Sequence, residues 1–280
     1  MWYTKGVSWV LLIGFFVIGA LMGSFACCTA RRQSGGLTGK LRGRRRSACA
    51  SCGKQLAARD LIPILSWVGL KGKCRYCKKL IGKREVLAEL GLGLAFAASY
   101  LFWPWALEGW GAWAGLIVFL VSLVTMTVLF ITDLFEHELS TMLLMLNIIC
   151  ACAWTGIMLA TNAVGANLWS RLGAVAILAG VYLALYLVSK GKKASGKKYG
   201  QLVGDGDWLL ALGLAIFLGD WWLALLVLTG ANALGSLVAI PMLMSGRAKT
   251  GTAIPFGPFL MVAFLVVFLM QTWLLGFAAF

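Results

Sequence analysis

The chain has 280 residues, a formal net charge of +15 and 61% hydrophobic residues. Its mean hydropathy of +0.88 is far above that of a water-soluble domain, which excludes an ordinary soluble enzyme. One helical crossing of a bilayer needs about 20 apolar residues, and the chain has enough for about eight crossings. The composition therefore predicts an all-α polytopic membrane protein with about eight transmembrane helices.

The first predicted span is Val7–Ala30. We interpret it as a retained helix and not a cleaved signal peptide, because it is long and is followed by Arg31 and Arg32. The other predicted spans are Val86–Trp105, Trp113–Thr132, Thr141–Ala160, Leu172–Val188, Trp208–Leu218, Trp221–Met244 and Phe256–Trp273.

Positive charge is concentrated in three segments between these spans. The segment Arg31–Arg84 holds 16 of the 25 lysines and arginines, and smaller clusters follow at Lys190–Lys198 and at Arg247 and Lys249. Eight spans would place all three segments on one side, which the positive-inside rule makes cytoplasmic, with both termini outside. The charge also suits contact with anionic lipid. Nucleic-acid binding is unlikely, since no aromatic platform accompanies the charge.

Two CxxC pairs lie in the first basic segment. They are Cys49 with Cys52 and Cys74 with Cys77. Four thiolates at this spacing suit a tetrahedral structural zinc site. Two disulfides or a redox pair are the alternatives, and a cytoplasmic loop disfavours disulfides. We therefore expect three parts: the first transmembrane helix at 1–30, a cytoplasmic tetracysteine zinc domain at 31–85, and a transmembrane core at 86–280.

Two aspartates lie beside predicted spans. Asp133 closes the apolar run Leu116–Thr132, and Asp207 precedes the run Trp208–Leu218. Carboxylates at the edge of hydrocarbon are costly and by default suggest a function. The predicted topology places both at the cytoplasmic edge. Two carboxylates that share one proton can activate water and protonate a leaving group, as in an aspartic protease.

The stretch before Asp207 contains Gly204 and Gly206, which let the backbone bend and approach another segment closely. Simpler interpretations remain open: Asp207 could be a helix cap, and Asp133 an interfacial polar residue. Asp205 is a third candidate for the pair, whereas His137 is read as a bystander.

Two other classes of function compete with a protease. A membrane-anchored zinc module could bind partners without catalysis. A proton-coupled transporter could also use acidic residues, but these would be expected near the bilayer midplane and not at one edge.

The motifs together resemble the prepilin peptidase family (type IV leader peptidases), which are membrane aspartic proteases with a GxGD motif. The resemblance covers most of the chain and several motifs in order. These are Gly23-Ser24-Phe25, the segment Cys49–Glu89 with Asp60-Leu61-Ile62-Pro63, Ser66-Trp67 and Arg84, then Asp133-Leu134, Gly204-Asp205-Gly206-Asp207 and Ile254-Pro255-Phe256-Gly257-Pro258-Phe259.

The resemblance implies that Asp133 and Asp207 are the catalytic pair. The implied substrate is a prepilin or pseudopilin whose short basic leader is removed at the cytoplasmic edge of the bacterial inner membrane. Members with the tetracysteine loop also methylate the new N-terminus from S-adenosylmethionine, so methyl transfer is implied here. A basic leader needs acidic partners, and Glu89, just inside the second span, is the best candidate; a structural hydrogen bond is the equal alternative.

Overall fold

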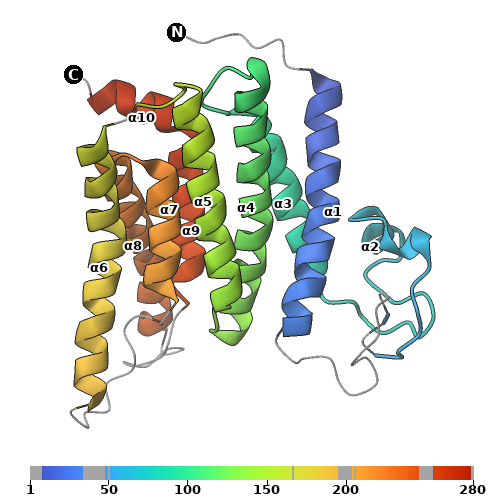
Figure 1. Cartoon of the computed structure of the whole chain (residues 1–280). Coiled ribbons are helices and arrows are strands. Elements are labelled where there is room, and N and C mark those ends of the chain that lie inside the picture. The colour runs from blue at the N-terminus through green and yellow to red at the C-terminus, as the bar shows by residue number, and fades with distance from the viewer. Residues whose placement is uncertain are drawn as a thin grey trace. The chain divides into compact units, whose positions relative to one another are not determined.

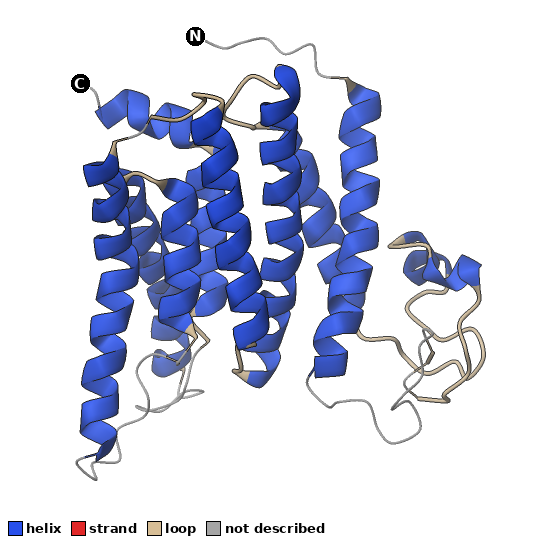
Figure 2. Cartoon of the chain, viewed as in Figure 1, coloured by secondary structure: helices blue, strands red, loops and turns tan. Residues whose placement is uncertain are grey.

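The computed structural model describes residues 8–33, 48–49, 51–165, 167–194, 204, 206–245 and 255–278. These residues form helices joined by loops, and Figure 2 shows no strand among them. They also contain two isolated β-bridges. The chain divides into two compact units, residues 1–101 and 102–280. The all-α prediction is confirmed. Asp205, Ile254, Arg247 and Lys249 lie outside the described residues.

Unit 1 is built on two antiparallel helices, α1 (Trp9–Gln33) and α3 (Lys83–Leu101). They pack closely because α1 presents small residues to α3. A Cβ added at Gly19 would lie 2.6 Å from the Leu92 carbonyl oxygen, and one at Gly23 would lie 2.5 Å from that of Ala88. Two small residues four positions apart commonly let the backbones of membrane helices approach this closely.

Between α1 and α3 the chain forms a short 3-10 helix, η1 (Ala58–Leu61), and the one-turn helix α2 (Leu65–Gly69). The residue before α2, Ile64, has φ 61° and ψ −53°. This conformation is costly for a β-branched residue and must be held by surrounding contacts.

Unit 2 contains seven helices among its described residues, which Figure 1 labels. They are α4 (Gly109–Glu136), α5 (Thr141–Ala160), α6 (Leu168–Ala194), α7 (Asp207–Leu218), α8 (Trp221–Met244), α9 (Gly257–Leu269) and α10 (Gln271–Ala278). Successive helices from α4 to α9 run in opposite directions. The C-terminal end of α4 and the N-terminal ends of α7 and α9 therefore lie at one end of the unit.

The core of unit 2 is aromatic. Phe119 of α4 stacks on Phe268 of α9 with ring centroids 4.4 Å apart, and Phe217 and Trp154 pack around this pair. Trp103 is only 4% exposed and contacts the same cluster. These contacts hold α4, α5, α7 and α9 together, so the ends of α4 and α7 are fixed in relation to each other.

Five described helices are long and apolar enough to cross a membrane: α1, α4, α5, α6 over Leu168–Val188, and α8. Helices α7 and α9 are apolar but have 12 and 13 residues. Helix α3 begins at Lys83, earlier than predicted, so four charged residues fall in its first two turns. The predicted span Phe256–Trp273 is interrupted at Met270, and the buried polar residue Gln271 opens α10. The chain is thus a multi-pass membrane protein with five candidate spans, and the count of eight stays a prediction.

Candidate active site and metal centre

The four predicted cysteines come together in unit 1. The sulfur atoms of Cys49, Cys52, Cys74 and Cys77 all lie within 4.8 Å of one another, and the Cys49 and Cys77 Sγ atoms are 3.9 Å apart. Zn–S bonds of about 2.3 Å in a tetrahedron place sulfur atoms roughly 3.8 Å apart. The cluster therefore fits a tetrahedral metal ion, with four protein ligands and no open position.

The two CxxC turns, Cys49–Cys52 and Cys74–Cys77, are called knuckles here, and they have the same local structure. In the first, the Cys49 amide donates to the Lys54 carbonyl, and Ala48 pairs with Gln55; in the second, the Cys74 amide donates to the Lys79 carbonyl. The residue after the second cysteine is left-handed in both, with φ 70° at Gly53 and 60° at Lys78. These turns aim both thiols of a knuckle at one point.

Backbone N–H groups favour the ionised form of the Cys74 thiol in the second knuckle. The hydrogen bond from the backbone of Cys77, and that from Tyr76, lower the pKa of the Cys74 thiol. A cation also links the knuckles, because the Lys54 Nζ lies 4.5 Å from the centre of the Tyr76 ring. A thiolate is the form that binds a metal ion, so this backbone arrangement favours metal binding.

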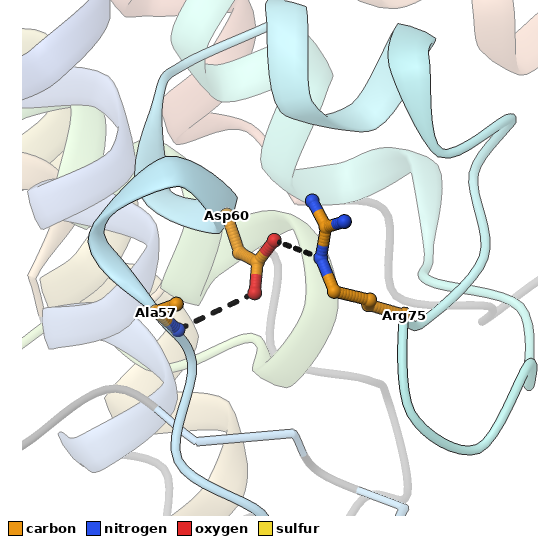
Figure 3. Close-up of polar contacts among 3 residues, drawn as sticks. All are labelled: Ala57, Asp60 and Arg75. Carbon is orange, nitrogen blue, oxygen red and sulfur yellow. Dashed lines mark hydrogen bonds and ion pairs between the residues drawn. The ribbon is translucent and has the colours of Figure 1, made fainter.

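A part-buried ion pair attaches the second knuckle to η1, as Figure 3 shows. The Arg75 Nε donates to the Asp60 Oδ1 at 2.7 Å, and the Ala57 amide donates to the Oδ2 at 3.3 Å. Burial by itself would raise the pKa of Asp60, but the hydrogen bonds from Arg75 and Ala57 and the charge of Arg75 outweigh it and lower the pKa. Asp60 is therefore ionised and holds the second knuckle in place.

Glu89 is buried in α3, and the structure gives it a hydrogen-bonding role. Its Oε2 accepts from the Ile64 amide at 2.7 Å. Ile64 is the residue with the unfavourable backbone conformation, so Glu89 holds the strained start of α2. The sequence left two roles open for Glu89, leader binding and a structural hydrogen bond, and the structure contains such a hydrogen bond.

A cavity of about 310 Å³ in unit 1 lies beside the cysteine cluster, and Glu89, Glu85 and Trp67 line it. Arg31 forms an ion pair with the Glu85 Oε1. The Glu85 Oε2 and the Trp67 Nε1 are buried without a hydrogen-bond partner in the part of the chain that the structure describes. Two of the side chains on the cavity wall thus carry a buried polar atom without a partner among the described residues.

In unit 2, both aspartates are buried at the end where α4 stops and α7 starts. Asp133 lies in the last turn of α4 and Asp207 is the first residue of α7, each 6% exposed. Asp207 is close enough to Asp133 for an electrostatic interaction between the two carboxyl groups. Unit 2 therefore brings these two residues into one buried site.

The glycines before Asp207 allow this approach. A Cβ at Gly206 would lie 2.7 Å from the Leu139 Cβ, in the connection between α4 and α5. The Asp207 Oδ2 accepts from the Gly204 amide at 2.8 Å, and no side chain caps α7, whose N-cap residue is Gly206. The Asp207 carboxyl group is therefore turned back toward the GxGD segment instead of capping its own helix.

The segment before the last span also reaches this site. Gly257 opens α9, and a Cβ added there would lie 2.6 Å from the Asp133 Oδ2. Only glycine lets the start of α9 come this close. Four segments thus meet here: the end of α4, the α4–α5 connection, the start of α7 and the start of α9.

Sequence reasoning missed Tyr182 of α6. This residue is 3% exposed and interacts electrostatically with Asp207, and its hydroxyl is buried without a partner among the described residues. Its ring also packs against Phe256, with centroids 5.5 Å apart. A tyrosine within an apolar helix was the only available signal.

The chain resembles known proteins over most of its length. A family model described as the bacterial peptidase A24 N-terminal domain matches residues 17–103. A protein of Stutzerimonas stutzeri named prepilin leader peptidase/N-methyltransferase is 32% identical over 217 residues, which is 78% of this chain and 69% of that protein. Proteins with the same name from Pectobacterium carotovorum subsp. carotovorum and Pseudomonas aeruginosa are 34% and 33% identical over 77% and 78% of this chain, and 71% and 69% of theirs.

No solved structure matches the chain. Each match is longer than either unit, so these relatives align with parts of both units. The chain therefore belongs to the prepilin peptidase A24 family, a bacterial enzyme family.

Proposed function

We propose that the protein is a membrane-embedded aspartic endopeptidase that removes the short basic leader of a type IV prepilin or pseudopilin. The observation that carries this proposal is the burial of Asp133 and Asp207 at the same end of unit 2, with Asp207 within range of the charge of Asp133. The family and the names of the relatives support the choice of substrate.

The chemistry follows from two carboxyl groups that share one proton. The ionised carboxylate takes a proton from a water molecule, which attacks the scissile carbonyl carbon. The protonated carboxyl group donates its proton to the carbonyl oxygen, and the other carboxyl group, which now carries the proton taken from water, passes it to the leaving amine as the C–N bond breaks. The apparent pKa values of two such coupled carboxyl groups describe the pair and not either residue alone. Tyr182 offers a buried hydroxyl beside Asp207 that can donate to the reacting group or position the carboxylate.

The test is mass spectrometry of a co-expressed prepilin, which reports leader removal and any added methyl group together. Asp133→Asn and Asp207→Asn should each abolish cleavage while the protein stays folded. Glu136→Gln and Glu138→Gln are matched controls, since Glu136 is the last residue of α4, Glu138 follows it, and both are exposed. A membrane-anchored binding module would tolerate both aspartate changes, so unchanged cleavage in either Asn variant would exclude the proposed pair.

We also propose that the cysteine cluster holds a structural zinc ion. All four positions of a tetrahedral ion would be filled by Cys49, Cys52, Cys74 and Cys77. A closed site gives the ion a folding role, and the segment between α1 and α3 has too little core to fold without one. Zinc removal should therefore loosen this segment.

For the second activity we propose methylation of the new N-terminus from S-adenosylmethionine, which the names of the relatives support. The cavity beside the cysteine cluster is our candidate donor site, because Glu89 on its wall suits a cationic sulfonium and Trp67 contributes a flat ring. When bound, the donor supplies a methyl group to the amine. Equilibrium binding of labelled S-adenosylmethionine to the full chain, lost in Trp67→Ala, would support this placement.

Leader binding by Glu89 remains part of the proposal. Its hydrogen bond to Ile64 uses one carboxylate oxygen, and the residue also lines the cavity. Glu89→Gln keeps an acceptor for Ile64 but removes the charge. Unchanged prepilin KM and kcat in this variant would leave Glu89 with its structural role alone.

We propose that the protein lies in the bacterial inner membrane with both termini outside. The basic segments around Arg31–Arg84 and Lys190–Lys198 would then be cytoplasmic by the positive-inside rule. The ends of α4 and α7 that carry the aspartates would face the cytoplasm as well, where a prepilin leader is found. Protease accessibility of tags at the two termini would test this orientation.

A further inference from the structure

Unit 2 has a second cavity, also of about 310 Å³, at the end opposite the aspartates. Its walls come from the connection after α5, the start of α6, the end of α7, the start of α8 and the start of α10. No step of the proposed peptidase chemistry uses this cavity.

The residues that line this cavity carry hydrogen-bond donors without acceptors. The Trp154 Nε1, the Gln271 Nε2 and the Arg171 Nε are buried and have no partner in the described part of the chain. Trp154 is 2% exposed and Gln271 is 6% exposed. A buried donor left without an acceptor is unfavourable, so three such donors on side chains of one cavity wall favour a ligand rich in acceptor oxygens.

The charges around the cavity favour an anion. Arg171 forms no ion pair with another described residue, and its Nη2 donates to the Gly165 carbonyl oxygen at 3.0 Å. Asp220, also on the wall, already accepts from the Ser170 hydroxyl at 2.7 Å and from the Trp222 amide at 2.9 Å. The Asp220 carboxylate is therefore already hydrogen-bonded within the protein, whereas the charge of Arg171 is not balanced by an ion pair among the described residues.

A glycine beside Arg171 leaves room for its guanidinium group. Gly219 has φ 61°, and a Cβ there would lie 2.9 Å from the Arg171 Nη1. Apolar side chains such as Trp105, Leu223 and Leu275 complete the walls. At the same end of the unit, Trp169 is 82% exposed and Trp221 is 48% exposed, which is typical of the level of lipid head groups.

We propose that this cavity binds a phosphate group, held by Arg171, Gln271 and Trp154. A phosphodiester head group of an anionic phospholipid and free inorganic phosphate share this chemistry. The apolar walls and the exposed tryptophans favour the lipid.

The experiment uses the full chain purified in a nonionic detergent and counts bound molecules by native mass spectrometry. The probes are phosphatidylglycerol, diacylglycerol, which lacks phosphate, and inorganic phosphate. Gln271→Glu keeps the shape of the side chain but puts a negative charge beside the phosphate. Arg171→Gln removes the cation, and Lys190→Gln, near the other end of α6, is the matched control.

We expect the wild type and Lys190→Gln to bind phosphatidylglycerol at least tenfold more tightly than Gln271→Glu or Arg171→Gln, a difference of about 1.4 kcal/mol or more. Diacylglycerol should not bind at this site. Binding of inorganic phosphate with the same dependence on the variants would identify free phosphate as the source. Equal binding of all probes by all four proteins, or no binding by the wild type, would overturn the proposal.

Discussion

The contact between Gly257 and Asp133 gives a sharp test of the aspartate site, because it alters the geometry without removing a carboxyl group. In Gly257→Ala the new Cβ would lie 2.6 Å from the Asp133 Oδ2, against an ordinary contact of at least 3.4 Å. The carboxylate or the start of α9 must therefore shift by about 0.8 Å. Gly257 does not have a positive φ, so alanine adds this contact without adding backbone strain.

The expected loss follows from that shift. Misplacing a catalytic group by about 1 Å can cost about 10²-fold in rate. We therefore expect kcat for prepilin cleavage to fall by about 10- to 100-fold, which corresponds to about 1.4–2.7 kcal/mol in the activation free energy. Because the substrate need not contact Gly257, KM should change less than kcat.

The assay is steady-state cleavage of a purified prepilin in detergent, followed by mass spectrometry, with thermal unfolding measured in parallel. Gly156→Ala is the matched control, since Gly156 lies in α5 of the same unit and a Cβ there meets nothing within 4 Å. Folded Gly257→Ala protein with the kcat of the wild type would refute the argument that the start of α9 sets the position of Asp133.

Three further predictions concern unit 1. Elemental analysis should find about one zinc ion per chain, lost in Cys49→Ser. The pKa of Asp60 is lowered on folding, so its ion pair with Arg75 stabilises the protein above the unfolded pKa of about 3.9 and this stabilisation is lost as the pH falls through the lower folded value. Asp60→Asn should therefore lower the unfolding temperature by more at pH 7 than at pH 3, and an equal deficit at both values would contradict this account. Gly23→Leu should destabilise the packing of α1 on α3 by at least the about 1–3 kcal/mol typical of overpacking, whereas Gly14→Leu, where a Cβ meets nothing within 4 Å, should unfold like the wild type.

The sequence by itself determined the features that depend on local pattern. Apolar runs of sufficient length predict helices because the backbone must satisfy its own hydrogen bonds in lipid, and the long helices α1, α4, α5, α6 and α8 confirm most of these predictions. The two CxxC pairs also predicted their own cluster, because a short turn between cysteines fixes how the thiols point. The family, too, was recognisable from motifs in order.

Tertiary structure alone decided how distant segments meet. Asp133 and Asp207 are buried at the same end of unit 2 because the helices that carry them pack together through Phe119, Phe217 and Phe268, and no spacing in the chain encodes that arrangement. The hydrogen bond of Glu89 to the strained Ile64 likewise depends on packing between segments.

The burial of Trp103 within the aromatic core shows the same limit. The sequence places this residue at the end of the predicted span Val86–Trp105, where a tryptophan is typical of the membrane interface, but in the fold its ring is part of the core. Apolar side chains serve lipid contact and core packing equally well. The sequence therefore determines which segments are apolar, and only the packing of the helices decides which of their faces are buried in protein.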